Sequence, residues 1–262
     1  LAKGVGGFYL CGSTGEGMSM SVAERKLVTE VVLAQVNGRA PSIVHVGTVT
    51  ARDAADLAHH AAEHGAAGIS SVLPPLFNNV PSLCAYFEML AAAAPGLPLL
   101  PYLYGGPTDA VALMRQFMTI PTVTGAKYTG PNMYELGHIA ALREDKWAVF
   151  SGMDEQCLFA AMSGACGNIG STVNLMPGVY REIHKACQAG DLARGLELQQ
   201  RANAVTATLI EAGLMGALKI ALGTLGFPCG ELRLPRLMPD GGARSSLFAR
   251  LEACGLPELT EL

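Results

Sequence analysis

Lys127 is the residue whose type and surroundings point most directly to chemistry. It lies in Thr-Val-Thr-Gly-Ala-Lys-Tyr-Thr-Gly (residues 122–130), an apolar and β-branched run typical of a buried strand that ends in a turn. The chain has six lysines, and a charged lysine is costly to bury. A desolvated amine loses its proton more readily, and the neutral amine attacks carbonyl carbons to form a Schiff base. A strand-end lysine that reaches solvent or a carboxylate is the alternative interpretation.

Hydroxyl groups and backbone amides follow an earlier strand-like segment. Residues 12–17 read Gly-Ser-Thr-Gly-Glu-Gly and lie before a helical pattern, where backbone amides bind anions well. The segment lacks the lysine of a P-loop and the spacing of a dinucleotide-binding fingerprint. A carboxylate held by Ser13, Thr14 and their amides explains the segment at least as well as a phosphate does. A tight strand-to-helix turn is the structural alternative.

Polar groups also stand at the ends of later strand-like segments. Tyr102 and Tyr104 close one such segment, and Asp154 and Glu155 follow another. Two adjacent carboxylates supply several hydrogen-bond acceptors for a neutral polyol, although either carboxylate can instead cap the helix that follows. The remaining candidates at strand ends are Thr129, Gly152 and Ser171.

Strand-like and helix-like segments alternate along the chain and must position these residues. Strand patterns cover residues 7–12, 42–47, 68–73, 98–104, 122–128, 147–152 and 166–171. Helical patterns cover residues 22–35, 51–64, 82–94, 109–118, 133–142, 154–163 and 177 to about 225. Buried strands that alternate with covering helices predict a parallel sheet. Seven consecutive units favour a closed barrel over an open doubly wound sheet.

The sequence therefore predicts an α/β fold, a (βα)₈ TIM barrel with a C-terminal helical subdomain. Because seven units are visible, we expect the first strand to lie upstream of Leu1. Residues 1–176 then form barrel strands two to eight, and residues 177–262 form helices packed on the barrel. The chemistry of such a barrel takes place at the C-terminal ends of its strands, so the candidate residues are expected to converge on one face.

Composition excludes several classes of partner. The formal net charge of −4 and the absence of a basic run argue against nucleic acid. The seven cysteines form no CxxC pair, so we expect no disulfide scaffold or zinc motif and a cytoplasmic protein with reduced thiols. No apolar run reaches the roughly 20 residues of a membrane span. With 50% hydrophobic and 15% charged residues, a homo-oligomer, either a tetramer or a dimer, is expected.

The histidines offer one candidate metal pair. His60 and His64 are spaced i, i+4 on a predicted helix that also carries His59, a spacing that suits metal binding. No carboxylate or cysteine motif completes a site, so surface histidines and no metal are predicted. His45 lies in an apolar strand and is predicted to be a hydrogen-bonded core histidine.

Together these segments resemble the N-acetylneuraminate lyase and dihydrodipicolinate synthase family of class I aldolases. The resemblance covers the chain from residue 4 to about 239. It rests on a tyrosine in a middle strand and on four motifs: Gly-Ser-Thr-Gly-Glu-Gly (12–17), Gly-Ala-Lys-Tyr-Thr (125–129), Phe-Ser-Gly-Met-Asp-Glu (150–155) and Gly-Asn-Ile-Gly-Ser-Thr-Val-Asn (167–174). Within the family, the Ser-Gly-Met-Asp-Glu and Gly-Ser-Thr-Val-Asn segments are similar to the sialic acid lyase branch.

The resemblance implies a role for each candidate residue. Lys127 would form the Schiff base with the 2-keto carbon, and Tyr102 would relay the proton. Ser13 and Thr14 would hold the carboxylate of the pyruvate portion, and Thr129 would bond the sugar chain near the scissile bond. The polyhydroxy tail would be bound by Gly152, Asp154, Glu155 and Ser171. No cofactor is implied.

The chain also departs from the family pattern at three places. The synthase branch is expected to carry an arginine shortly after the tyrosine, for a second carboxylate, and residues 103–108 contain none. The stretch between Tyr102 and Lys127 is a few residues short, which leaves Tyr104 as the alternative relay. The family often presents a tyrosine from a neighbouring subunit where this chain reads Leu76 and Phe77. A phenylalanine cannot relay a proton, so any relay there would use water or be absent.

The resemblance implies a lyase that cleaves N-acetylneuraminate reversibly to N-acetylmannosamine and pyruvate. Two alternatives stay open at this stage. One is a class I aldolase for another 2-keto-3-deoxy sugar acid. The other is a barrel without catalysis that senses a keto acid or a sugar.

Overall fold

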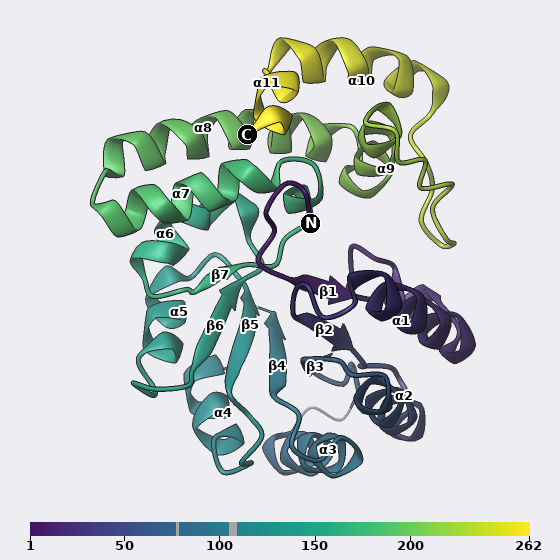
Figure 1. Cartoon of the computed structure of the whole chain (residues 1–262), viewed down its shortest axis with the longest axis vertical. Helices are drawn as coiled ribbons and strands as arrows, with labels where there is room; N and C mark the ends of the chain where they lie inside the picture. The colour runs from purple at the N-terminus through teal and green to yellow at the C-terminus, as the bar shows by residue number, and fades with distance from the viewer. Residues whose placement is uncertain (77–78, 105–108) are drawn as a thin grey trace. The chain divides into compact units, whose positions relative to one another are not determined.

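The computed structural model describes residues 1–76, 79–104 and 109–262 (Figure 1). The chain divides into two compact units, and each is described by itself. The first unit contains Gly6–Gly152 and Ser163–Cys166, together with Leu1. The second unit contains Ala2–Val5, Met153–Met162 and Gly167–Leu262.

A parallel sheet forms the centre of the first unit. Its strands follow one another in chain order: β1 (Phe8–Leu10), β2 (Ser42–His45), β3 (Gly68–Val72), β4 (Leu99–Tyr104), β5 (Gly125–Thr129) and β6 (Ala148–Ser151). Almost every residue of β3, β4 and β5 is buried, as expected for strands covered on both faces. At Gly125 the backbone has φ of 154° and a Cβ atom would lie 1.9 Å from the Ala148 carbonyl oxygen, so only glycine allows β5 to approach β6 this closely.

Helices alternate with these strands and lie around them (Figure 1). Ser21 begins the first α-helix with a capping box, in which its hydroxyl accepts from the Glu24 amide while the Glu24 carboxylate accepts from the Ser21 amide. Asn79 and Asp109 cap α3 and α4 with a single bond each, in which the side-chain oxygen accepts from a backbone amide of the first turn. The helical elements are η1 (Gly17–Ser19), α1 (Val22–Val36), α2 (Ala51–Glu63), α3 (Val80–Ala93), α4 (Ala110–Phe117) and α5 (Met133–Ala140).

The second unit is mostly helical and has its own apolar core. The core consists of one face of each long helix, with Val179, Ile183, Leu198, Val205 and Leu209 fully buried. The elements are η2 (Asp154–Gln156), α6 (Cys157–Met162), β7 (Gly167–Asn168), η3 (Thr172–Asn174), α7 (Pro177–Ala189), α8 (Leu192–Glu211), α9 (Leu214–Thr224), α10 (Gly241–Ala253) and α11 (Leu256–Glu261).

The predicted α/β class with a parallel sheet is confirmed, and the described residues contain the seven strands that the sequence pattern predicted. Helices α10 and α11 lie within the stretch 177–262 that was predicted to be helical, although the helical pattern itself extends only to about residue 225. The closed barrel, its additional strand, the C-terminal subdomain and the boundary between residues 176 and 177 stay predictions. The predicted position of Phe77 lies outside the described residues, as do residues 105–108.

No single helix among the described residues is long and apolar enough to cross a membrane, although α8 and α9 together pass on length and composition with a bend of 115° between them.

Candidate functional site

Lys127 lies inside the first unit against two aromatic rings. It is the third residue of β5 and is 6% exposed. Its Cα partner on β4 is Tyr102, so both side chains leave the sheet on the same face. The Lys127 Nζ atom lies 4.0 Å from the ring centroid of Tyr102 and 4.5 Å from that of Tyr9. Both distances are within the range of a cation–π interaction, which favours a positive charge on this nitrogen.

Hydrogen bonds fix the two rings that face Lys127. The Tyr9 hydroxyl donates to Ser70 Oγ at 2.9 Å, and Ser70 Oγ donates to the Leu100 carbonyl at 2.7 Å. The Tyr102 hydroxyl accepts from Thr129 Oγ1 at 3.4 Å. Burial raises the pKa of both tyrosines well above the usual value, and for Tyr102 the neighbouring Tyr104 adds to the effect. Both phenols therefore stay neutral beside the lysine at ordinary pH.

Gly152 makes room for the lysine and for Thr129. A Cβ atom at position 152 would lie 1.8 Å from Thr129 Oγ1 and 3.1 Å from Lys127 Cε. Only a residue without a side chain allows the backbone after β6 to pass this close to them. The structure thus brings together four of the residues that the sequence singled out: Lys127, Tyr102, Thr129 and Gly152.

Ser13 and Tyr104 extend this cluster toward solvent. Tyr104, the last residue of β4, is 50% exposed, and its ring stacks on Tyr102 with centroids 4.8 Å apart. Its hydroxyl lies 3.2 Å from Ser13 Oγ. Ser13 and Thr14 are half-buried in a tight loop closed by the Gly17 amide, which donates to the Gly12 carbonyl at 3.1 Å. The loop therefore places the Ser13 hydroxyl beside an accessible phenol.

His45 is a buried, hydrogen-bonded histidine, which confirms its prediction as a core residue. Its Nε2 atom accepts from the Val72 amide at 3.1 Å. Burial lowers the pKa of His45 to about 3, and the charges of Arg25 and Lys127 contribute in the same direction. The ring therefore stays neutral, with centroids 6.3 Å from Tyr102 and 6.2 Å from Tyr9.

Two residues of this region were missed from the sequence. Tyr9 was not singled out, although a tyrosine in a predicted buried strand is a signal for a polar contact in the interior. Arg25 on α1 is 2% exposed and donates to the carbonyls of His45 and Gly47, the latter at 2.9 Å. A single arginine in a helical pattern is usually exposed, so no sequence signal distinguished it.

Three of the predicted polyol-binding residues, Asp154, Glu155 and Ser171, lie in the second unit, where Asp154 is already engaged. Asp154 is 3% exposed, and its Oδ2 atom accepts from the amide and the hydroxyl of Thr172 at 2.7 and 2.8 Å. Burial raises the pKa of this carboxyl, and the Thr172 bonds oppose that effect. Glu155 and Ser171 are half-buried. Of the three, Asp154 therefore has a clear internal role in the unit.

The prediction about the histidine pair is partly wrong. His60 is only 8% exposed, so it is not a surface histidine. A carboxylate does lie within reach, because Glu30 of α1 forms an ion pair with His60. This partner could not be predicted from the sequence, because Glu30 lies on another helix, 30 residues away from His60. Among the described residues, one ligand atom each of Glu30, His60 and His64 lie within 4.8 Å of one another.

Comparisons with known proteins identify relatives of this chain by sequence and by structure. The profile of the "Dihydrodipicolinate synthetase family" matches residues 1–254. A protein of Rhizobium meliloti named "N-acetylneuraminate lyase" is 35% identical over 236 residues, which cover 88% of this chain and 78% of that protein.

Solved structures carry two kinds of name. The N-acetylneuraminate lyase of Proteus mirabilis superposes with a TM-score of 0.91 at 28% identity, over 97% of this chain and 88% of that one. A putative dihydrodipicolinate synthetase of Pseudomonas aeruginosa superposes with a TM-score of 0.87 at 25% identity, over 97% and 89% of the two chains. The chain belongs to the dihydrodipicolinate synthetase family.

Proposed function

We propose that this chain is a class I aldolase that cleaves N-acetylneuraminate reversibly to N-acetylmannosamine and pyruvate through a Schiff base on Lys127. The observation that carries the proposal is the burial of Lys127 against Tyr9 and Tyr102, with the hydroxyl of Thr129 beside them. Family membership and a curated relative named N-acetylneuraminate lyase support the reaction class.

The proposed reaction begins with the neutral Lys127 amine. The amine attacks the 2-keto carbon, and loss of water gives a protonated imine. A base then takes the proton of the C4 hydroxyl, the C3–C4 bond breaks, and its electron pair moves toward the imine nitrogen to form an enamine. The aldehyde released is N-acetylmannosamine. Protonation of the enamine at C3 and hydrolysis of the imine release pyruvate and regenerate the amine.

The aromatic faces suit the charge changes of this reaction. Lys127 carries a positive charge as ammonium and as protonated imine, and both states gain from the faces of Tyr9 and Tyr102. The two faces therefore favour the protonated imine, which is the electron sink of the proposed reaction. The raised pKa values of Tyr9 and Tyr102 keep the rings neutral throughout.

The substrate carboxylate is assigned to Ser13, Thr14 and the amides of their loop. The proton relay needs a phenol that the substrate can reach. The sequence assigned it to Tyr102, with Tyr104 as the alternative. Exposure favours Tyr104, whose hydroxyl lies beside Ser13, because Tyr102 is 2% exposed and its hydroxyl is bonded by Thr129. We therefore assign the proton relay to Tyr104. Tyr102 is assigned the aromatic face that contacts the Lys127 nitrogen.

For the sugar tail, the family resemblance implies Thr129, Gly152, Asp154, Glu155 and Ser171. Of these, Asp154 accepts two hydrogen bonds from Thr172 within its own unit. A homo-oligomer and a cytoplasmic location stay predictions from composition.

Borohydride trapping tests the proposal. Incubation with pyruvate and borohydride, followed by intact-mass measurement and peptide mapping, should place one reduced three-carbon acid on Lys127. Turnover with a panel of 2-keto-3-deoxy sugar acids then identifies the substrate. An adduct on Lys185 or Lys219 instead would overturn the assignment of the lysine. An adduct on Lys127 with preference for another sugar acid would keep the chemistry and change the substrate, and trapping without turnover on any sugar acid would indicate a sensor.

The synthase reaction forms a separate arm of this test. Residues 103–108 contain no arginine to pair a second carboxylate, so condensation of pyruvate with aspartate semialdehyde should not exceed background. Robust condensation in a coupled assay would move the proposed substrate to that branch of the family.

A further inference from the structure

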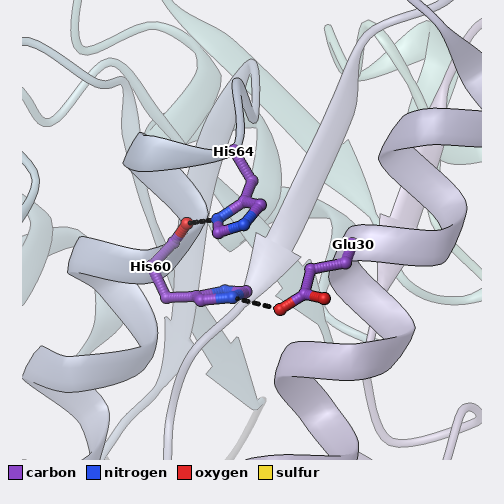
Figure 2. Close-up of side chains that lie close together, drawn as sticks. All are labelled: Glu30, His60 and His64. Atoms are coloured by element: carbon purple, nitrogen blue, oxygen red, sulfur yellow. Dashed lines mark hydrogen bonds and ion pairs between the residues drawn. The ribbon is translucent and has the colours of Figure 1, made fainter.

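Glu30, His60 and His64 gather between two neighbouring helices of the first unit (Figure 2). Glu30 lies on α1, His60 lies in the last turn of α2, and His64 is the residue after that helix. One ligand atom of each residue lies within 4.8 Å of the others. His60 Nε2 is 2.9 Å from Glu30 Oε1, and the two imidazole rings stack with centroids 4.0 Å apart.

The tautomer of His64 leaves a nitrogen lone pair for a ligand. Its Nδ1 atom lies 2.8 Å from the His60 carbonyl oxygen. A carbonyl can only accept, so Nδ1 carries the proton and Nε2 carries the lone pair in the neutral ring. A hydrogen bond from one ring nitrogen to a backbone carbonyl is the usual support of a histidine that binds metal through the other nitrogen.

A metal ion would bind between Glu30 and His60, where the two side chains now share a hydrogen bond. His60 Nε2 and a Glu30 oxygen face each other, so a proton between them can be replaced by a divalent cation and released to solvent. Tetrahedral coordination with bonds of about 2.0 Å separates ligand atoms by about 3.3 Å. Glu30 and His64 are exposed and can move the short distance required, while His60 is held by burial.

We propose that Glu30, His60 and His64 form a binding site for a divalent transition metal ion, with Zn²⁺ as the best match. Imidazole nitrogens with one carboxylate suit zinc and its neighbours, whereas calcium and magnesium prefer oxygen ligands. Three protein ligands leave the fourth position to water. Because His64 is exposed and borders a hollow of about 360 Å³, solvent can reach that position.

The position of the cluster indicates a structural role for the bound ion and not a catalytic one. His64 precedes β3 by four residues, so the cluster lies near the amino end of that strand. Tyr104, Thr129 and Gly152 stand at the carboxyl ends of their strands. The ion would join α1 to α2 one turn away from the Lys26–Asp56 ion pair, which already links the same helices at 2.8 Å.

Metal titration tests the site on the full-length protein. Metal-stripped protein is titrated with Zn²⁺ by calorimetry and with Co²⁺ by visible absorption, with thiols blocked because the chain has seven cysteines. We expect one saturable ion per chain and a Co²⁺ spectrum of nitrogen and oxygen ligands. The exposed variants Glu30→Gln and His64→Gln should each weaken binding roughly 10- to 100-fold or more, because removal of even an outer-shell partner has an effect of that size.

His59→Gln is the matched control. His59 stands on the same helix and pairs with Glu63 at 3.4 Å, but it lies outside the cluster. This variant should bind zinc as tightly as the parent chain. Absence of saturable binding, or binding that Glu30→Gln and His64→Gln leave unchanged, would overturn the proposal. A loss of binding only in His59→Gln would do the same.

Thermal unfolding supplies a second readout. An ion bound only to the folded chain, at a concentration a hundredfold above its Kd, should raise Tm by roughly 5–10 °C. The rise should disappear in His64→Gln and persist in His59→Gln. An equal rise in both variants would place the stabilising ion elsewhere and contradict the site.

Discussion

Two clusters of titratable side chains in the first unit handle positive charge in different ways. Around Lys127 the contacts include the faces of two neutral phenols, and the nitrogen is buried. Around His60 the partner is the Glu30 carboxylate, and two of the three members are exposed. The aromatic faces favour a positive charge on the Lys127 nitrogen, as ammonium and as protonated imine, whereas the Glu30 carboxylate pairs directly with His60. The first cluster therefore suits chemistry and the second suits binding.

Replacement of Lys127 should have the largest effect on catalysis and none on zinc binding. Lys127→Arg keeps a positive charge near the rings but removes the amine that forms an imine, so turnover and borohydride trapping with pyruvate should both vanish. Lys185→Arg, at an exposed lysine paired with Glu182, is the control and should leave both unchanged. Zinc binding should be the same in all three proteins. Trapping that survives in Lys127→Arg would remove the lysine from the mechanism.

The next largest effect is expected at the two tyrosines of β4, whose phenylalanine variants should differ in kcat. Tyr104→Phe removes the hydroxyl beside Ser13 and should lower kcat by roughly 10²- to 10⁴-fold, the usual contribution of an acid–base group. Tyr102→Phe keeps the ring over Lys127 and loses the hydroxyl that accepts from Thr129, so its kcat should stay within about tenfold of the parent. Steady-state kinetics with the sugar acid measures both. The reverse ranking would return the relay to Tyr102, the residue that the sequence favoured.

The sequence predicted the residues around Lys127 better than the group of Glu30, His60 and His64, for a physical reason. Thr129 and the loop that carries Ser13 stand at the ends of strands, and Lys127 lies two residues before the end of β5. The alternating pattern identifies strand ends without knowledge of packing. The contact between Tyr9 and Lys127 depends on how β1 and β5 curve toward each other, which no local pattern encodes.

Helix packing hid other residues from the sequence. Glu30 meets His60 only because α1 and α2 pack with those faces together. Arg25 is buried against the end of β2, where it donates to the carbonyls of His45 and Gly47. The pattern of each helix shows which side is apolar but does not show which polar residues of two helices meet. Tertiary packing fixes these pairs, so the partner of His60 and the burial of Arg25 emerged only with the fold.

Gly152 offers a test of the space around the lysine. Gly152→Ala would place a Cβ atom 1.8 Å from Thr129 Oγ1 and 3.1 Å from Lys127 Cε. Displacement of these groups by about 1 Å should lower kcat/KM on the order of 100-fold. Gly223→Ala, in a helix with nothing within 4 Å of the new Cβ atom, is the control and should keep full activity. Equal activity in both variants would mean that the backbone after β6 shifts enough to accommodate the new Cβ atom without moving Thr129 or Lys127.

The aromatic faces themselves should have a smaller effect. Tyr102→Leu removes one face from Lys127, and a cation–π contribution of about 0.5–2 kcal/mol corresponds to a roughly 2- to 30-fold weaker imine with pyruvate. The measurement is the fraction trapped by borohydride as pyruvate concentration varies. Tyr102→Phe is the control and should form the imine as the parent does. Equal imine formation in Tyr102→Leu would mean that the ring fills space without favouring the charge.

Zinc should have the smallest effect on catalysis, although it stabilises the fold. The proposed ion lies near the amino end of β3, and the reacting groups stand at carboxyl ends, so the ion touches neither Lys127 nor the phenols around it. Loading the protein with Zn²⁺ and then removing the ion with a chelator should shift Tm reversibly while kcat/KM stays within about twofold, because a bound structural ion leaves the geometry of a distant site unchanged. Inhibition that persists in His64→Gln would come from zinc bound elsewhere, for example at a cysteine. A change in kcat/KM of tenfold or more that disappears in His64→Gln would show that the two clusters are coupled, and the division between chemistry and binding would then fail.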